Sequence, residues 1–281
     1  MTSPRASIRS GAAAVVTRPG EPGQRLSAAL RDQGQAALWW PAFDLLAPLD
    51  ADALQSVGQR LAEFDLAVFV SPVSVRAWAK LDPGSPWPAA TAIAGVGAST
   101  LQAALTLLPG AGAAHAIAPA PHDQAGSEGL WEALRRQTSM PRRVLIVRAE
   151  AGRDWLADRL REAGCQVEYA CVYRRAVHAP GPEQRAALWA CMAAGASAVM
   201  VVTSSEAVSA LDSQLEPGSE LAAWLRQGLA LASHPRVGQA LQAAGYVRVK
   251  LCEPSSLAVL EAIAGEQRSE RGPQLAESST R

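Results

Sequence analysis

The 281-residue sequence lacks a charge excess and long apolar runs, and each absence excludes a class of protein. Its 26 basic residues balance its 26 acidic residues, so no positive surplus marks it for a nucleic-acid backbone or an anionic membrane. Charged residues, proline or glycine interrupt every apolar stretch before the roughly 20 residues that cross a bilayer. The amino terminus shows no apolar segment of the kind that directs export. We expect a soluble, cytoplasmic protein that binds neither nucleic acid nor membranes.

Signatures of metal and cofactor chemistry are also missing. Cys165, Cys171, Cys191 and Cys252 show no Cys-x-x-Cys spacing, and the four histidines are scattered, so neither a metal site nor a disulfide framework is indicated. The sequence has no nucleophile elbow, no P-loop lysine, no His-Glu-x-x-His and no Gly-x-Gly-x-x-Gly after the first strand. An enzyme made from this chain would have to hold its substrate in a reactive shape and stabilise developing charge without a cofactor.

What the sequence does contain is an internal repeat. The segment Val16–Gly34 (VTRPGEPGQRLSAALRDQG) returns as Val147–Gly164 (VRAEAGRDWLADRLREAG), so that Arg18 falls on Arg148 and the closing glycines coincide. Each copy reads as strand, turn, helix and glycine stop. The repeat favours two similar lobes with a cleft between them.

A second pair of segments follows in the same order. Phe64–Trp78 aligns with Ser197–Leu211, which places Ser71 on Ser204, and a weaker third match lies further along. Both members of the second pair are apolar strands that run into a helix with a hydroxyl residue at its start. Unrelated strand–helix units share such a composition, which is the alternative explanation for these matches.

Strand and amphipathic-helix patterns alternate along most of the chain, which predicts parallel sheets with helices on both faces. Two strand candidates stand apart, because Ala37–Leu46 and Gln166–Arg174 occupy equivalent positions, with Phe43 on Tyr173. Ten extended residues reach about 33 Å, enough to lead from one lobe to the other, and two such segments could pair as a ladder. The repeat order leaves open whether each lobe is contiguous or takes its first strand–helix unit from the other copy, although this length favours exchange.

Ligands of open parallel sheets bind beyond the carboxyl ends of the strands, where loops lead into helix N-termini. In this chain those loops carry hydroxyl, glycine and arginine residues, which suit anionic groups. The candidate binding residues are Arg18, Ser71, Ser99, Thr100, Arg148, Ser204, Ser205 and Arg236. Each serine could instead be no more than the N-cap of its helix. Tyr173 is a polar aromatic residue on a connecting strand, and a structural tyrosine is its alternative role.

Four segments together resemble the uroporphyrinogen-III synthase family in order and spacing over nearly the whole chain. They are VVTRPG (Val15–Gly20), VLIVRAEAGRDWL (Val144–Leu156), VYRR (Val172–Arg175) and VVTSSEAV (Val201–Val208). The resemblance implies an α/β protein with two similar parallel-sheet, flavodoxin-like lobes, joined by a two-stranded β-ladder, with the chain exchanged between lobes. The expected division is 1–36 plus 178–264 for lobe 1, 47–165 for lobe 2, 37–46 and 166–177 for the linker strands, and 265–281 for a disordered tail.

The resemblance also implies a reaction. The linear tetrapyrrole hydroxymethylbilane would lose water and close to uroporphyrinogen III with its last ring inverted, on a monomeric enzyme without a cofactor. Tyr173 would be the catalytic residue and would donate a hydrogen bond to the leaving oxygen. The substrate's eight carboxylates would meet the candidate binding residues. Near Pro235, where many members have a hydroxyl residue, this chain has Arg236. Either Arg236 binds a carboxylate of the substrate, or this side of the cleft contributes only its shape.

Two other functions compete with this hypothesis. One is a non-catalytic two-lobed binding or regulatory domain that has the same fold without the reaction. The other is a nucleotide-dependent enzyme of the doubly wound type, although Gly95-Val96-Gly97 lacks the third glycine of a dinucleotide fingerprint.

Overall fold

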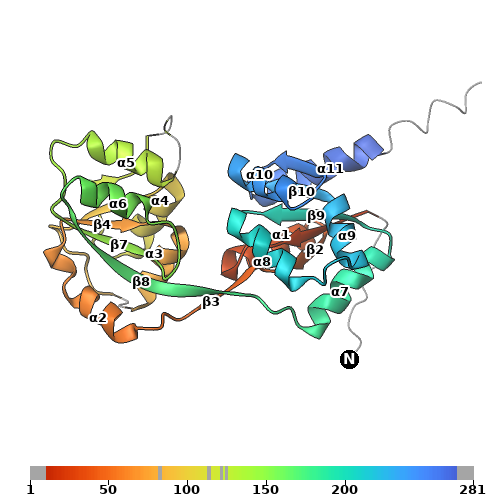
Figure 1. The fold of residues 1–281 in the computed structure, drawn as a ribbon, viewed down its shortest axis with the longest axis horizontal. Coiled ribbons are helices and arrows are strands. Elements are labelled where there is room, and N and C mark those ends of the chain that lie inside the picture. Colours follow the sequence, from red (N-terminus) through yellow and green to blue (C-terminus); the bar gives the residue numbers. More distant parts are fainter. Residues whose placement is uncertain (1–10, 82–83, 113–114, 121–122, 124–125, 271–281) are drawn as a thin grey trace, which may run out of the picture. The chain divides into compact units, whose positions relative to one another are not determined.

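The structure is a computed structural model that describes residues 11–81, 84–112, 115–120, 123 and 126–270. It is an α/β protein with two mainly parallel sheets, each covered by helices (Figure 1). The chain divides into two compact units. Unit 1 comprises Met1–Asp44 and Ala176–Arg281, and unit 2 comprises Leu45–Arg175.

Unit 1 is built on a five-stranded sheet in the order β11-β10-β9-β1-β2, in which every recorded pairing is parallel. Its strands are β1 (Ala12–Val16), β2 (Ala36–Trp39), β9 (Ser197–Val202), β10 (Leu229–Ala232) and β11 (Arg248–Leu251). Its helices are α1 (Gly20–Asp32), α7 (Pro182–Ala193), α8 (Ser205–Gln214), α9 (Glu220–Gln227), α10 (Pro235–Ala243) and α11 (Ser256–Glu270).

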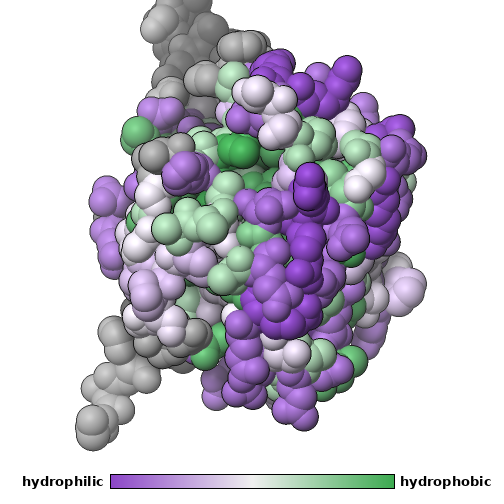
Figure 2. Space-filling view, turned by 90° about the vertical axis from the view of Figure 1, so that its left-hand side faces the viewer, coloured by the Kyte–Doolittle hydropathy of each residue, from purple (hydrophilic) through white to green (hydrophobic). Residues whose placement is uncertain are grey.

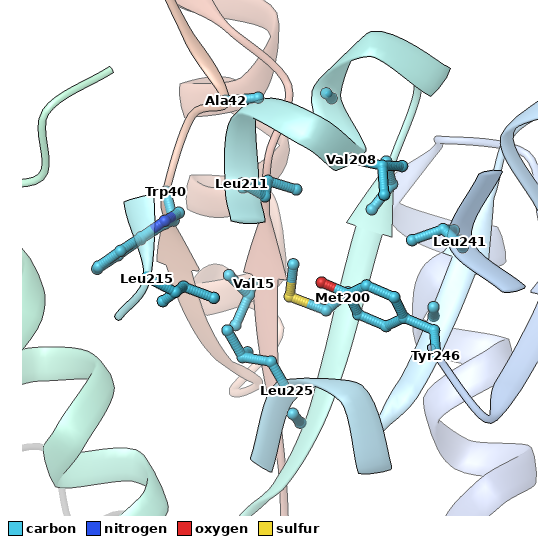
Figure 3. Packing of buried hydrophobic residues seen from close by; sticks show 14 of the residues in the cluster. Val15, Trp40, Ala42, Met200, Val208, Leu211, Leu215, Leu225, Leu241 and Tyr246 are labelled. Atoms are coloured by element: carbon cyan, nitrogen blue, oxygen red, sulfur yellow. The ribbon is translucent and has the colours of Figure 1, made fainter. Parts of the chain in front are cut away.

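The apolar run of β1 is buried on both faces, as expected for a central parallel strand. Val15 belongs to the cluster on one face, whereas Ala14 and Val16 belong to the cluster that α1 and α11 cover on the other. Figure 3 shows the first cluster, in which Met200 of β9 lies among residues from α8, α9 and α10. The period-2 alternation of the strand thus supplies both cores of unit 1.

Unit 2 is built on a six-stranded sheet in the order β3-β8-β7-β4-β5-β6. The strands of this sheet are β3 (Phe43–Leu46), β4 (Leu66–Phe69), β5 (Ala92–Gly95), β6 (Ala116–Ile117), β7 (Arg143–Ala149) and β8 (Gln166–Val177), of which β3 and β8 each run across a boundary between the two units. Its helices are α2 (Ala51–Gln59), a 3-10 turn (Leu61–Glu63), α3 (Pro72–Leu81), α4 (Ala98–Leu107), α5 (Ser127–Arg135) and α6 (Trp155–Glu162). One apolar cluster covers each face of this sheet as well.

The strand orders of the two sheets match the repeat. The run β2-β1-β9-β10-β11 in unit 1 corresponds, strand for strand, to β8-β7-β4-β5-β6 in unit 2. In sequence, however, β1 and β2 open the first copy while β9, β10 and β11 belong to the second, so the sheet of unit 1 combines red and blue-green strands in Figure 1. The first strand–helix unit of each copy therefore pairs with the later strands of the other copy.

The prediction of one linker strand over residues 37–46 is wrong. The segment forms two strands, because β2 ends at Trp39 as an edge strand of the unit 1 sheet and β3 begins at Phe43. Pro41 has no N–H to donate and interrupts the ladder. The side chain of Gln214 holds the break, since it accepts from the Trp40 indole at 2.6 Å and donates to the carbonyl of Pro41 at 3.0 Å.

Two further expectations need correction. The segment 166–177 is one strand, β8, and it neighbours β3 as expected, but from Gln166 to Tyr173 it also pairs with β7 and so belongs to the unit 2 sheet. The tail expected over 265–281 begins too early, since α11 continues to Glu270, and residues 271–281 lie outside the described part. Helices α2 and α9 are additions that the sequence patterns did not predict.

The predicted glycine stops are present in both copies. Gly34 follows α1 with φ of +77° and Gly164 follows α6 with φ of +89°. Only glycine adopts this left-handed conformation without strain, so each ends its helix and turns the chain toward the next strand.

Among the described residues, no helix is long and apolar enough to cross a membrane, and no cluster of three or more histidine, cysteine or acidic residues could hold a metal ion. The four cysteines are unpaired thiols. The face drawn in Figure 2 is largely hydrophilic, with smaller hydrophobic patches between the polar side chains.

Candidate functional site

The carboxyl ends of β1, β9 and β10 form one edge of the unit 1 sheet. Backbone hydrogen bonds of 3.2 Å from Thr17 N to Val201 O and from Ser233 N to Val202 O join these neighbouring strand ends. The buried Thr17 hydroxyl also donates to Val201 O at 2.8 Å. This edge therefore brings together the loops that carry four of the predicted binding residues: Arg18, Ser204, Ser205 and Arg236.

The loop after β1 is tightly packed against α1. The carbonyl of Arg18 accepts from the indole of Trp39 at 2.9 Å. A Cβ atom added at Gly23 would lie 1.9 Å from that same carbonyl oxygen, so the helix can approach the loop only through a glycine. The backbone of Arg18 is thus fixed, and its side chain is half-buried.

Two helices begin at this edge with different caps. Ser204 stands at the N-cap of α8, yet its hydroxyl makes no capping hydrogen bond, and Ser205 is exposed in the first turn. At α10 the cap is His234, whose Nδ1 accepts from the backbone N–H of Arg236 at 3.2 Å. Arg236 itself is exposed in the first turn of that helix. Since helix N-termini attract negative groups, this edge suits an anionic ligand.

At the corresponding edge of unit 2, the hydroxyl of Ser71 caps a helix, unlike that of Ser204. The Ser71 hydroxyl accepts from Ser74 N at 3.1 Å, while the Ser74 hydroxyl donates to Ser71 O at 2.8 Å. Ser71 is therefore an N-cap in the ordinary sense, the alternative that the sequence left open for it. Ser99 is exposed and Thr100 is buried, and both lie in the first turn of α4 behind Gly97.

Arg148 lies at the end of β7, and its side chain is bound by neighbouring groups of unit 2. Its side chain is 8% exposed and forms an ion pair with Asp154 at 2.5 Å. Its Nε donates to the carbonyl of Ala149 at 3.1 Å, and its guanidinium lies 5.0 Å from the ring centre of Tyr169. The hydrogen bond from Arg148, followed by that from Tyr169, lowers the pKa of the Asp154 carboxyl. This arrangement favours a structural role for Arg148 over carboxylate binding.

A β-bulge determines where Tyr173 points. The strands β7 and β8 are in regular register up to Arg148 opposite Cys171, after which Ala149 faces Tyr173 and Val172 is the extra residue. In a regular strand Val172 and Tyr173 would point to opposite faces, yet both contact the same apolar cluster. The half-buried ring of Tyr173 thus lies on the face that sequence alternation alone would not give it.

The three tyrosines of the chain differ in how their hydroxyls are used. Burial, aided by nearby Asp212, raises the pKa of Tyr246 to about 12 in the core of unit 1. Tyr169 donates to Asp154 at 3.0 Å, and burial raises its pKa. The Tyr173 ring is half-buried, and its hydroxyl has no hydrogen-bond partner among the described residues, whereas the Tyr246 side chain is enclosed in the core at 3% exposure. Tyr173 therefore combines partial exposure with a hydroxyl that can donate to a ligand.

Sequence reasoning missed the residues that surround Arg148 and the backbone contact of Tyr173. Asp154 and Tyr169 complete the surroundings of Arg148, and the backbone N–H of Glu150 donates to the carbonyl of Tyr173 at 3.0 Å. The available signal was the acid six residues after Arg148, but such spacing is common in loops and has no specific meaning without the fold.

A cavity of about 810 Å³ also lies within unit 2. It is bounded by α2 and by the carboxyl-terminal ends of α3 and α4, with Leu54, Trp78 and Leu107 among its lining residues. Those helix ends are opposite the N-termini that carry Ser71 and Ser99, so the cavity is not part of the candidate site.

Comparison with known proteins identifies a family. The family model of uroporphyrinogen-III synthase HemD matches residues 24–256. The uroporphyrinogen-III synthases of Salmonella typhimurium and Escherichia coli are 29% and 28% identical over 242 residues, which cover 85% of this chain and 94% of each relative.

Solved structures show the same fold. A mutant uroporphyrinogen III synthase from Thermus thermophilus matches with a TM-score of 0.60 at 20% identity, over 93% of this chain and 99% of that one. The enzyme from Helicobacter pylori matches with a TM-score of 0.55 at 15% identity, over 91% and 99% of the respective chains.

Proposed function

This chain belongs to the uroporphyrinogen-III synthase family, and we propose from this premise how its residues convert hydroxymethylbilane to uroporphyrinogen III. The reaction is that of a hydro-lyase. The substrate loses its terminal hydroxyl as water and closes into a ring, with its last pyrrole inverted. The candidate site suits this chemistry, since its polar groups are hydrogen-bond donors and cations rather than a nucleophile with its base.

The free hydroxyl of Tyr173 is the single observation that carries our assignment of the catalytic residue. Tyr173 donates a hydrogen bond to the leaving oxygen and transfers its proton as the C–O bond breaks, so the oxygen departs as water. The electron pair of the pyrrole nitrogen stabilises the positive charge on the methylene carbon that is left behind, which gives a cationic azafulvene.

The substituted α-carbon of the last ring attacks this methylene carbon and gives a spiro intermediate. The bond from that α-carbon to its original methylene bridge then breaks, which leaves the bridge carbon as a second azafulvene on the third ring. The free α-carbon of the last ring attacks this bridge carbon, and loss of the proton from that α-carbon restores the pyrrole and completes the inverted macrocycle. The phenolate of Tyr173 regains a proton from the one released when the ring closes.

The carboxylates of the substrate are bound mainly by the edge of unit 1. Arg18, Ser204, Ser205 and Arg236 provide two guanidinium groups and two hydroxyl groups near the N-termini of α1, α8 and α10. Arginine binds a carboxylate through two parallel hydrogen bonds, so Arg236 takes the place of a hydroxyl donor. In unit 2, the exposed Ser99 gives a further contact at the start of α4, whereas Ser71, Thr100 and Arg148 support the strand-end edge of that unit from within.

The remaining parts of the proposal concern the setting of the reaction. The chain acts as a monomer in the cytoplasm and needs no cofactor for a dehydration that exchanges no electrons.

The experiment is to supply hydroxymethylbilane to the purified protein and to separate the cyclic products by chromatography. We expect the type III isomer to dominate. Formation of the type I isomer alone, which is the spontaneous product, would contradict the proposal. Calorimetry with an unreactive analogue of hydroxymethylbilane would then show whether the chain is a non-catalytic binding domain. Tight binding of a nucleotide would instead favour the doubly wound enzyme.

A further inference from the structure

The bulge between β7 and β8 is the structural feature on which the direction of Tyr173 depends. Arg148 and Tyr169 belong to the face of the sheet covered by α5 and α6, while Val172 and Tyr173 contact the cluster on the opposite face. Without the extra residue, Tyr173 would lie on the same face as Tyr169, because a one-residue shift of register turns every following side chain over. Whatever stabilises the bulge therefore controls the hydroxyl of Tyr173.

Arg148 is placed to stabilise it. Its Nε donates to the carbonyl of Ala149, the residue that faces Tyr173 across the ladder, at 3.1 Å. The same guanidinium holds Asp154 at 2.5 Å, so the loop from residue 150 to residue 154 folds back over the strand end. Gly152 shows how closely the loop fits, since a Cβ atom there would lie 2.7 Å from Nη2 of Arg148.

Tyr169 closes this arrangement from the β8 side. Its hydroxyl donates at 3.0 Å to the same Asp154 oxygen that binds Arg148, and its ring lies beneath the guanidinium. Tyr169 precedes the bulge on β8 and Arg148 precedes it on β7. The hydrogen bond from Glu150 N to Tyr173 O holds the strands together beyond it.

We propose that Arg148, Asp154 and Tyr169 form a bracket that maintains the bulge and thereby positions the hydroxyl of Tyr173. They are positioning residues that do not contact the substrate, and their role in turnover rests on the proposed function of Tyr173. The bracket acts through the backbone, since its side chains lie across the sheet from the ring of Tyr173. Displacement of a reacting group by about 1 Å costs up to about 100-fold in rate, so a loosened bracket lowers kcat without weakening substrate binding.

Tyr169→Phe is the variant on which the test depends, because it removes one hydrogen bond and keeps the ion pair between Arg148 and Asp154. Asp154→Asn removes the counter-charge of Arg148 as well and serves as the stronger second variant. Tyr246→Phe and Glu162→Gln are the matched controls. Glu162 pairs with Arg159 at 2.6 Å on the exposed surface of α6.

The kinetic experiment is a double-mutant cycle with Tyr173→Phe. We expect Tyr169→Phe to lower kcat about 10-fold with KM changed by less than about 2-fold. In the Tyr173→Phe background the same change should have almost no effect, because there is no hydroxyl left to position. A loss that is additive with Tyr173→Phe, or one that raises KM instead, would overturn the proposal. The wild-type product assay separately decides whether the chain is a synthase.

A spectroscopic readout tests the bracket without turnover. In protein labelled with ring-¹³C tyrosine, the chain gives three tyrosine signals, each assignable by its Phe variant. We expect the Tyr173 signal to shift or broaden in Tyr169→Phe and Asp154→Asn and to stay unchanged in the two controls. An unchanged Tyr173 signal in both bracket variants would show that the bulge stands without them.

Discussion

The loops after β1 and β7 occupy equivalent positions in the repeat, and each has an arginine at the same place, yet they use it differently. After β1, helix α1 begins at Gly20, and Gly23 packs against the carbonyl of Arg18. After β7, helix α6 begins only at Trp155, and the longer loop wraps the side chain of Arg148. The shorter loop leaves its arginine side chain half-buried at the sheet edge, whereas the longer one buries it.

The serines of the second repeat show the same contrast. Ser71 of unit 2 caps α3 with its hydroxyl, while Ser204 of unit 1 stands at the start of α8 without a capping hydrogen bond. The two copies thus share their strands and helices, but their equivalent polar side chains make different contacts. Ser71 and Arg148 of unit 2 make hydrogen bonds within their own strand-end edge, whereas the Ser204 hydroxyl of unit 1 caps no helix.

The largest effect should come from the tyrosine that distinguishes the two units. Tyr173→Phe removes the donor for the leaving oxygen, and loss of such proton donation typically lowers the rate by about 10²-fold to 10⁴-fold. We expect kcat to fall in this range while the melting temperature stays unchanged. Tyr246→Phe, in the core of unit 1, is the control and should keep its activity. Full activity of Tyr173→Phe would remove the residue from the mechanism.

The close approach of α1 to the β1 loop gives the next largest effect, on stability. Gly23→Ala places a Cβ atom against Arg18 O and should cost about 2–3 kcal/mol, since the backbone has to shift. Arg153→Ala is the matched change at the equivalent position of unit 2. Arg153 forms an exposed pair with Glu128 at 2.6 Å, so its loss should cost less than about 1 kcal/mol. Urea denaturation of both variants measures the difference, and equal costs would contradict it.

The two equivalent serines form a smaller, paired test. Ser71→Ala removes a capping hydrogen bond and should lower the free energy of unfolding by about 1 kcal/mol. Ser204→Ala removes no such bond and should leave stability unchanged, but it should raise KM because it takes a donor from the ligand edge. Denaturation and steady-state kinetics on both variants separate these effects. If Ser204→Ala proves the more destabilising, the contrast between the units is wrong.

The smallest expected effect is on the stability of unit 2 at acidic pH. The hydrogen bond from Arg60 is the main cause that lowers the pKa of Glu168 in unit 2, and Arg143 adds to it. A carboxyl whose folded-state pKa is lowered contributes stability above its unfolded pKa of about 4.3, and this contribution is lost as the pH falls through the folded-state value. We expect Glu168→Gln to reduce the loss of melting temperature between about pH 7 and about pH 3.5. Glu132→Gln, at an exposed pair with Arg135, is the control and should behave as wild type.

Much of the architecture was predictable from the sequence, and the predictions that failed depend on contacts between residues far apart in the chain. The alternating patterns gave the parallel sheets and the glycine stops, because both depend on residues close in sequence. The break at Trp40–Ala42 depends on Gln214, more than 170 residues away, which no local pattern contains. Of the candidate site, the strand ends were predictable from topology, but whether a hydroxyl or guanidinium is free at its strand end was not.

The sequence by itself determined the repeat, the strand ends and the place of Tyr173 within the repeat, since burial periodicity and turn chemistry are local properties. Only the tertiary structure decided which copies pair in each sheet, which way Tyr173 points and that Arg148 is held by Asp154 and Tyr169. The physical reason is that strand pairing and ladder register join residues far apart in the chain. A single extra residue in one ladder then changes which face a side chain occupies.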